Sequence, residues 1–193
     1  HRLITNFYVK MISKENFYKA IEILGFKRIG KSMTWSKNFG SLDCVMEADM
    51  RDDKPTYPEQ IQSDSDTTRN FSQPESYVVF ICVALLLEKG YRPEHIFLEK
   101  TWSLGHSAKS GRADITVYDE NGTNVLFIIE CKRAGKPFAD ARKLLFEGRD
   151  DKQLFSYLAQ ARSAKWLQLL AIDYDEEKKD IKIFEEIVKS HDD

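Results

Sequence analysis

The chain has 193 residues, of which 31% are charged and 42% are hydrophobic, and its formal net charge is −2. This composition is typical of a globular protein that buries one good core, or a core plus a small satellite. The longest apolar run, from Tyr77 to Leu87, is too short for a membrane-spanning helix, which needs about 20 residues. We therefore expect a buried helix there and no membrane partner.

The first residues of the chain and its cysteines indicate where the protein is located. The first residues carry no apolar signal-peptide core, and His1 in place of an initiator Met suggests a fragment or a processed chain. Cys44, Cys82 and Cys131 are odd in number and widely spaced, without a metal-knuckle pattern. We expect all three to be small core residues in a reduced, cytoplasmic protein.

Residues 1–60 are expected to form a small N-terminal α+β subdomain. Its helix begins at Ser13 and ends before Gly25, because apolar residues recur at helical spacing between them. Short strand-like pieces follow in residues 26–50, with a turn at Asn38-Phe39-Gly40. The next stretch, up to residue 73, is rich in Asp, Ser, Thr and Pro, so we interpret residues 61–73 as a linker.

The main domain is expected to cover residues 74–193. Pro74 suits the first turn of a helix that runs to about Lys89, and Gly90 ends it. The patterns then predict strands near 96–103, 113–118 and 125–132, helices near 138–146 and 151–163, and a strand at 166–172. This predicts an α/β fold with a mixed central sheet and an αβββαβ order of elements.

Three charged residues interrupt the two apolar strands at 113–118 and 125–132. The segment between them contains Asn121-Gly122 and is typical of a hairpin turn. Folding the strands back about this turn brings Asp114 opposite, or nearly opposite, Glu130. Lys132 shares a face with Glu130 because strand side chains alternate with period two. Two carboxylates and one ammonium group are therefore expected to converge.

This convergence predicts a divalent-metal site. Burying ionised groups costs several kcal/mol unless a partner compensates. Mg²⁺, with Mn²⁺ as a substitute, characteristically takes one or two carboxylates and completes its shell with waters and phosphate oxygens. Lys132 would then help to activate the attacking water or to stabilise the pentacovalent phosphorane. The alternative is a structural network of Asp, Glu and Lys in an ordinary hairpin.

Asp114 followed by Glu130-Cys131-Lys132 resembles the motif of the PD-(D/E)XK nuclease superfamily, with Ala113 in place of the usual proline. Together with Pro74-Glu75-Ser76, Gly90-Tyr91 and Gly111-Arg112-Ala113, the pattern is similar to the N-terminal nuclease domain of type I restriction enzyme R subunits and of fused restriction-modification methylases. The resemblance covers about residues 70–175. It implies a restriction-endonuclease-like fold and Asp114, Glu130 and the backbone carbonyl of Cys131 as metal ligands.

The same resemblance suggests roles for three further residues. Gln153 and Tyr157 match a Q-x-x-x-Y motif, which implies that Gln153 orients Lys132 or contacts phosphate and that Tyr157 contacts DNA. Gln153 could instead lie at the edge of a helix face. Glu75, at the start of the core helix, is expected to reach the metal through water. Its alternative role is to complement the helix dipole.

Charge is distributed unevenly along the chain. Residues 100–149 contain nine Lys or Arg and six Asp or Glu, whereas residues 173–193 contain nine acids and four Lys. We expect the basic part to face double-stranded DNA, with Lys109, Arg112, Arg133 and Lys136 as phosphate contacts. For each of these residues, a solvated surface charge is the alternative.

We therefore expect a Mg²⁺-dependent DNA endonuclease domain of a restriction-modification enzyme. The chain has neither the histidine spacing of a zinc hydrolase nor a phosphate-binding loop, so methylase, specificity or helicase parts would lie outside it. Two alternatives are a catalytically inactive DNA-binding module of the same fold and a repair or recombination exonuclease.

Overall fold

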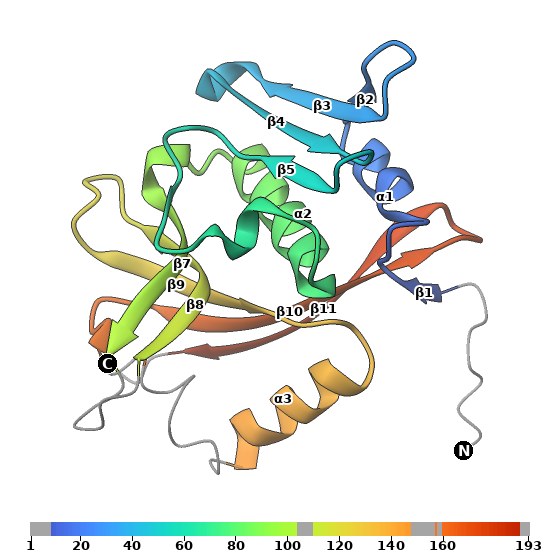
Figure 1. The fold of residues 1–193 in the computed structure, drawn as a ribbon. Helices are drawn as coiled ribbons and strands as arrows, with labels where there is room; N and C mark the ends of the chain where they lie inside the picture. Colours follow the sequence, from blue (N-terminus) through green and yellow to red (C-terminus); the bar gives the residue numbers. More distant parts are fainter. Residues whose placement is uncertain (1–8, 104–109, 148–156, 158–159, 190–193) are drawn as a thin grey trace, which may run out of the picture.

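A computed structural model describes residues 9–103, 110–147, 157 and 160–189 (Figure 1). These residues form a mixed α/β protein with a seven-stranded mixed sheet and a four-stranded antiparallel sheet. The α-helices are α1 (Phe17–Ile23), α2 (Pro74–Glu88) and α3 (Lys136–Glu147). The predicted α/β class with a mixed central sheet is thus confirmed. Among the described residues, no helix combines the length and the apolar composition that crossing a bilayer requires.

The main sheet has the strand order β1-β10-β9-β8-β7-β6, and β11 pairs with β10. Its strands are β1 (Val9–Met11), β6 (Gln62–Ser63), β7 (Ile96–Ser103), β8 (Ser110–Tyr118), β9 (Val125–Cys131), β10 (Trp166–Asp175) and β11 (Asp180–Lys189). Strands β7, β8 and β9 pair antiparallel, whereas β10 is parallel to β9. The chain between β9 and β10 includes α3, as a parallel connection requires.

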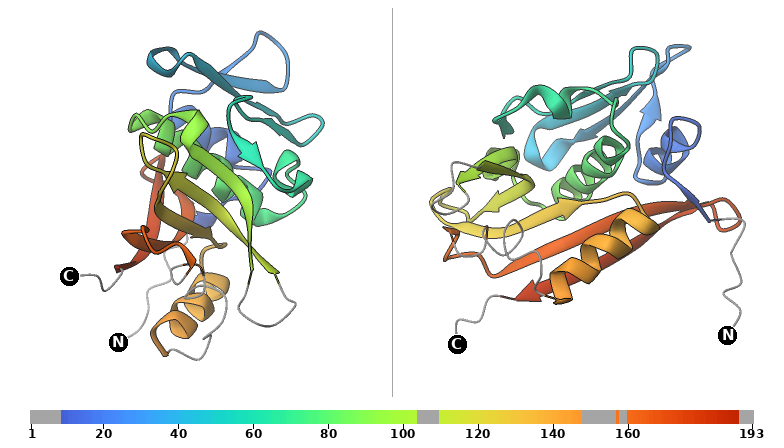
Figure 2. Two further views of the ribbon diagram at one scale, coloured as in Figure 1. Left: turned by 90° about the vertical axis from the view of Figure 1, so that its left-hand side faces the viewer. Right: turned by 60° about the horizontal axis from the view of Figure 1, so that its bottom comes forward.

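The smaller sheet contains β2 (Lys27–Arg28), β3 (Thr34–Phe39), β4 (Cys44–Asp49) and β5 (Lys54–Thr56). Helix α2 lies between this sheet and the main sheet, and α3 lies on the other side of the main sheet (Figures 1 and 2). One apolar core extends from the smaller sheet through α2 to the main sheet. It includes Phe17, Met46, Phe80 and Ile129. The N-terminal elements and the main sheet therefore share one core.

Helix α2 is apolar on every side because it is covered on two faces. Eleven of its residues are buried, from Ser76 to Leu87, as expected for a helix without a polar face. Pro74 occupies its first turn. At its end, the N–H of Gly90 donates to Leu87 and that of Tyr91 donates to Leu86. Gly90 has a φ of +96°, which explains the glycine at this helix end.

Several elements differ from the expectations at their boundaries. Helix α1 begins at Phe17 rather than Ser13, because the Asn16 side chain accepts from the Ser13 N–H at 2.8 Å and closes a turn there. The turn lies later than the expected residues 38–40, because Asn38 and Phe39 still belong to β3. The chain reverses through a 3-10 turn at Gly40–Leu42.

Other predicted segments contain more structure than expected. Residues 61–73 include β6, which pairs with β7, and a 3-10 helix at Asp66–Arg69. Strand β10 extends to Asp175, and the sequence did not predict β11, which pairs with it. The predicted helix at 151–163 lies largely outside the described residues. Tyr157 and Gln160 are helical, but Ala161 to Ala164 form a turn.

Candidate functional site

Three acidic residues form a row across three neighbouring strands. Leu98 of β7 pairs with Ile115 of β8, which pairs in turn with Ile129 of β9. One residue further along this register stand Glu99, Asp114 and Glu130. Directly opposed residues in antiparallel strands lie about 5 Å apart. The predicted hairpin register, with Asp114 opposite Glu130, therefore agrees with the observed pairing.

Hydrogen bonds fix the Asp114 and Glu130 carboxyl groups at the end of β9. The main-chain N–H of Cys131 donates to Oδ2 of Asp114 at 2.7 Å. The main-chain N–H of Asp114 donates to Oε1 of Glu130 at 3.3 Å. Glu130 is only 6% exposed, and Asp114 is partly buried. Each carboxyl group is therefore held by the backbone of the opposite strand.

Burial makes it energetically unfavourable for both carboxyl groups of this pair to be ionised. Burial raises the pKa of Glu130 well above its ordinary value, and repulsion from Asp114 raises it further. Burial also raises the pKa of Asp114, whereas the hydrogen bond from the Cys131 N–H lowers it. Without a cation, the pair as a whole is therefore expected to hold a proton more tightly than ordinary carboxyl groups do.

Lys132 and Glu75 both act electrostatically on this pair. Lys132 follows β9 directly, and its N–H donates to the Leu170 carbonyl of β10 at 2.9 Å. Its positive charge lowers the pKa of Asp114 and of Glu130, and the charge of Glu75 raises that of Asp114. Glu75 lies in the first turn of α2. The structure thus brings together four of the predicted site residues: Asp114, Glu130, Lys132 and Glu75.

Glu99 is a neighbour of the site that the sequence analysis missed. Its backbone is left-handed, with a φ of +54°, which is uncommon for a residue other than glycine. Burial and repulsion from Asp114 raise the pKa of its carboxyl group. The guanidinium Nε of Arg112 lies 3.8 Å from Oε2 of Glu99. Extending the hairpin register to the strand at 96–103 could have identified this third carboxylate.

Cys131 and Tyr157 do not face the site with their side chains. The Cys131 thiol is buried and interacts with Cys82 of α2. The three cysteines are buried and free, as predicted. Tyr157 is completely buried among Ile128, Leu145 and their neighbours. The expected DNA contact by Tyr157 therefore does not fit its position, because its ring belongs to an apolar cluster of the core.

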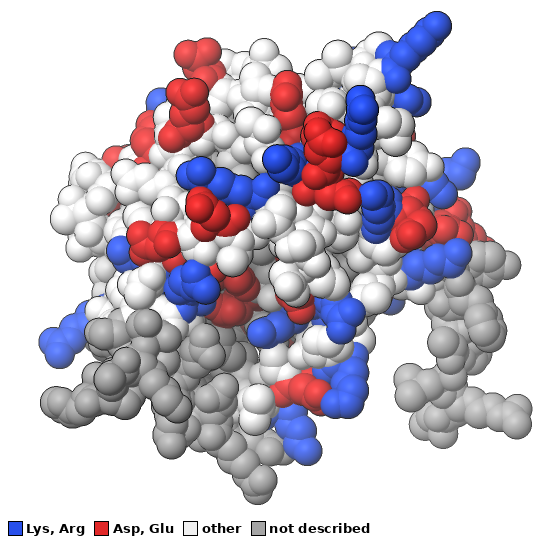
Figure 3. Space-filling view, in the orientation of Figure 1, with Lys and Arg blue, Asp and Glu red and all other residues white. Residues whose placement is uncertain are grey.

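The basic residues predicted to contact DNA differ in their exposure and in their ion pairs. Arg112 is exposed but lies beside Glu99, and Lys136 is exposed and forms an ion pair with Asp140 one helical turn away. Arg133 is half-buried next to Lys132. Gln153 and Lys109 lie outside the described residues. On the face drawn in Figure 3, the basic and acidic side chains of the described residues are interspersed rather than separated.

The Asp114–Glu130 pair suits a hydrated cation. Among the described residues, no three or more His, Cys, Asp and Glu side chains are grouped so as to enclose a metal ion. Mg²⁺ does not need such a cage, because it keeps several waters and binds through one or two carboxylates. A bound cation would also stabilise the ionised form of these two buried carboxyl groups, which burial and mutual repulsion disfavour. The residues present therefore fit Mg²⁺ or Mn²⁺.

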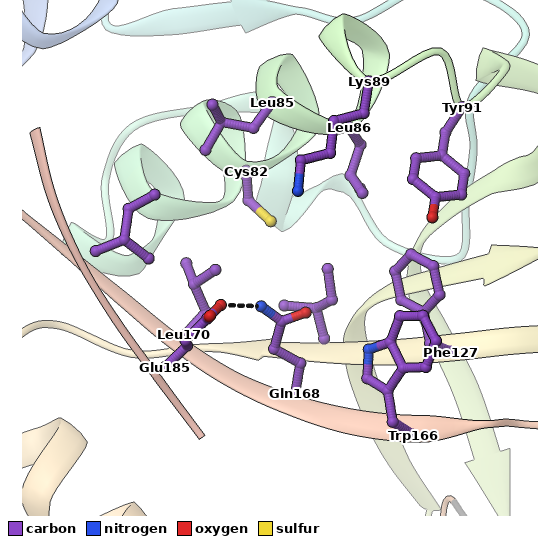
Figure 4. A pocket seen from close by; sticks show the side chains of 12 residues that line it. Cys82, Leu85, Leu86, Lys89, Tyr91, Phe127, Trp166, Gln168, Leu170 and Glu185 are labelled. Atoms are coloured by element: carbon purple, nitrogen blue, oxygen red, sulfur yellow. Dashed lines mark hydrogen bonds between the residues drawn. The ribbon is translucent and has the colours of Figure 1, made fainter. Parts of the chain in front are cut away.

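A separate cavity of about 180 Å³ lies between α2 and strands β9 to β11 (Figure 4). Phe127 and Trp166 stack on one another in its wall, with ring centroids 4.5 Å apart. Gln168 donates to Glu185 at 2.7 Å at its edge. Phe127 and Glu130 point to opposite faces of β9, because their positions differ by an odd number. The cavity is therefore not part of the carboxylate site.

No protein-family model matches this sequence, and no curated protein is significantly similar to it.

Proposed function

We propose that this chain is a metal-dependent DNA endonuclease domain that hydrolyses phosphodiester bonds. The observation that carries this proposal is the buried Asp114–Glu130 carboxyl pair on adjacent strands, with Lys132 directly after the second strand. A like-charged pair with raised pKa values and a nearby ammonium group is unfavourable as a mere scaffold element. It is favourable if a cation and a phosphate are bound there.

Asp114 and Glu130 would hold Mg²⁺ or Mn²⁺. The bound ion would lower the pKa of a coordinated water and stabilise charge on the phosphate. The Cys131 N–H orients the Asp114 carboxylate, and the Asp114 N–H orients that of Glu130. Lys132 would direct its ammonium group toward the attacking water or the phosphate. Glu75 would hold water at the start of α2.

The order of elements supports the proposal. Helix α2, strands β7 to β9, helix α3 and strand β10 follow one another as in an αβββαβ nuclease core, and β10 is parallel to β9. The motif residues lie at the central hairpin of this order. A restriction-modification enzyme, with methylase, specificity or helicase parts outside this chain, is the proposed setting, and double-stranded DNA is the proposed substrate.

Calorimetric titration with Mn²⁺ tests the site before any cleavage is measured. The wild-type chain should bind the ion, whereas Asp114→Asn and Glu130→Gln should lose most of the binding. Glu120→Gln is the matched control, because Glu120 is exposed in the turn of the same hairpin. If the wild-type chain does not bind Mn²⁺, or if both variants bind as it does, the metal site is wrong.

Cleavage of covalently closed DNA then tests the reaction. Asp114→Asn, Glu130→Gln and Lys132→Ala should each abolish Mg²⁺-dependent cleavage by the enzyme that contains this domain, while the thermal melt stays cooperative. Lys165→Ala is the control for the lysine, since Lys165 is exposed and distant in sequence. Full cleavage by any of the three variants would contradict the proposal. DNA binding without Mn²⁺ binding would favour an inactive DNA-binding module.

A further inference from the structure

Strand β11 presents a long outer edge. It pairs with β10 over its whole length, from Asp180 opposite Asp175 to Lys189 opposite Trp166. Within the part of the chain that the structure describes, no strand pairs with its other side. An edge of this kind carries unpaired N–H and C=O groups and is a template for another strand.

The side chains of β11 differ between its two faces. Ile183 and Ile187 are 43% and 47% exposed and flank Glu185 on the face toward α2. Lys182, Phe184 and Glu186 lie on the face toward α3, where Phe184 packs against Phe138. Large exposed apolar side chains on an unpaired edge strand are unfavourable in water. A second strand would cover part of this surface.

The charges on β11 select one way of pairing it with its own copy. A two-fold axis normal to the sheet keeps every residue on its own face, so the axis must pass through one residue position. With Phe184 at the axis, Lys182 of each copy lies opposite Glu186 of the other, and Ile181 lies opposite Ile187. The Lys182–Glu186 ion pair and the Ile181–Ile187 apolar pair therefore each occur twice.

The neighbouring registers place like charges opposite one another. An axis at Lys182, Glu185 or Glu186 would put that residue opposite its own copy. An axis at Ile183 would put Asp180 opposite Glu186. Like charges directly opposite each other in a sheet are destabilising. Among registers centred on residues 182–186, only the one at Phe184 pairs opposite charges and no like charges.

The two charged partners are accessible for this contact. Lys182 is exposed, with its ammonium group 5.1 Å from the centre of the Phe184 ring. Glu186 binds Arg142 through Oε1 and retains 26% of its side-chain surface. Its carboxylate has a second oxygen, Oε2, with which to meet a lysine from another copy.

We propose that two copies of this chain associate through antiparallel pairing of their β11 strands, with Phe184 at the two-fold axis. The two main sheets then form one continuous sheet. The contact is independent of the nuclease function proposed above, so either can fail without the other.

Sedimentation velocity over a concentration series tests the association. The wild-type chain should show a monomer–dimer equilibrium. Lys182→Glu should weaken it about tenfold or more, because it replaces two attractive contacts by two repulsive ones. Adding Glu186→Lys should restore it. Lys27→Glu is the control, since Lys27 is exposed on β2 of the smaller sheet. A monomer at every concentration, or a dimer indifferent to Lys182→Glu, would overturn the proposal.

Both substitutions also change contacts within one copy, because Lys182 lies opposite Asp173 of β10 and Glu186 binds Arg142. The melts of the single and the double variant must therefore be recorded alongside. A cross-link tests the register without altering Lys182 or Glu186. Phe184→Cys places two thiols opposite each other at the axis, whereas Glu185→Cys places them further apart. Mild oxidation should cross-link the first variant and not the second, and the three native cysteines are buried. Equal or preferential cross-linking of Glu185→Cys would exclude this register.

Discussion

The carboxyl group of Glu130 accepts a hydrogen bond from the main-chain N–H of Asp114 on the neighbouring strand, at 3.3 Å. The contact ties the side chain of one acid to the backbone of the other. Neither group can turn away from the other to relieve their repulsion without losing a backbone partner. The pair therefore responds to pH, to cations and to substitution as a unit.

The first prediction concerns pH. Burial raises the pKa of Glu130 above 4.5, its ordinary value, so the folded chain binds a proton that the unfolded chain has released. The metal-free protein should therefore lose stability as the pH rises from about 4.5 toward neutrality. Glu130→Gln should be more stable than the wild type at neutral pH and should show a flatter pH profile in denaturant unfolding.

Saturating Mn²⁺ provides the control for this pH effect. The ion should stabilise the wild-type chain at neutral pH, where it replaces the proton, and should not stabilise Glu130→Gln. An equally steep pH profile in wild type and Glu130→Gln would show that another buried acid dominates, with Asp173 the next candidate because burial also raises its pKa.

The second prediction separates the structural role of Asp114 from its role in metal binding. Asp114→Asn keeps an oxygen that can accept from the Cys131 N–H, whereas Asp114→Ala leaves this N–H unpaired. An unpaired buried donor costs about 1–3 kcal/mol. Urea unfolding should show that loss for the alanine variant and a smaller one for the asparagine variant, although both should lose Mn²⁺ binding. Equal stabilities would mean that water replaces the lost acceptor.

The third prediction concerns Tyr157. Its ring is completely buried beside Ile128 and Leu145. Tyr157→Ala should destabilise the chain by about 3–5 kcal/mol, as for other large aromatic residues in a core. Tyr157→Phe keeps the ring and should cost less. DNA affinity per folded molecule should be unchanged in the phenylalanine variant. A selective loss of DNA affinity there would restore the tyrosine as a contact.

The fourth prediction concerns DNA. Neutralising Arg133 and Lys136 together should reduce affinity about equally for all sequences. It should lower the slope of log affinity against log salt by about 0.9 for each lost phosphate contact. Filter binding across a salt series measures both quantities. Lys178→Ala with Lys179→Ala is the control, because acidic residues surround these exposed lysines. Equal losses in both regions would show that the proposed DNA face is wrong.

The sequence by itself determined the elements whose local signals are strong. Helix α2 was predicted from Pro74 to about residue 89 because a proline, an apolar run and Gly90 mark it. The Asn121-Gly122 turn and two apolar strands likewise defined the β8–β9 hairpin, and its alternating pattern placed Asp114 opposite Glu130. These features depend on residues close in the chain, where turn chemistry and side-chain periodicity act directly.

Tertiary structure alone decided which distant residues join this hairpin. Glu99 enters the row of acids only through the pairing of β7 with β8, and Glu75 acts on Asp114 because α2 lies against the sheet. Tyr157 is buried because it packs with Ile128 and Leu167 of the sheet. Strand β11 carries charged residues on both faces, so its sequence does not indicate which face is buried. Its strand conformation depends on pairing with β10. Such contacts depend on packing between segments far apart in sequence, and local patterns do not encode their partners.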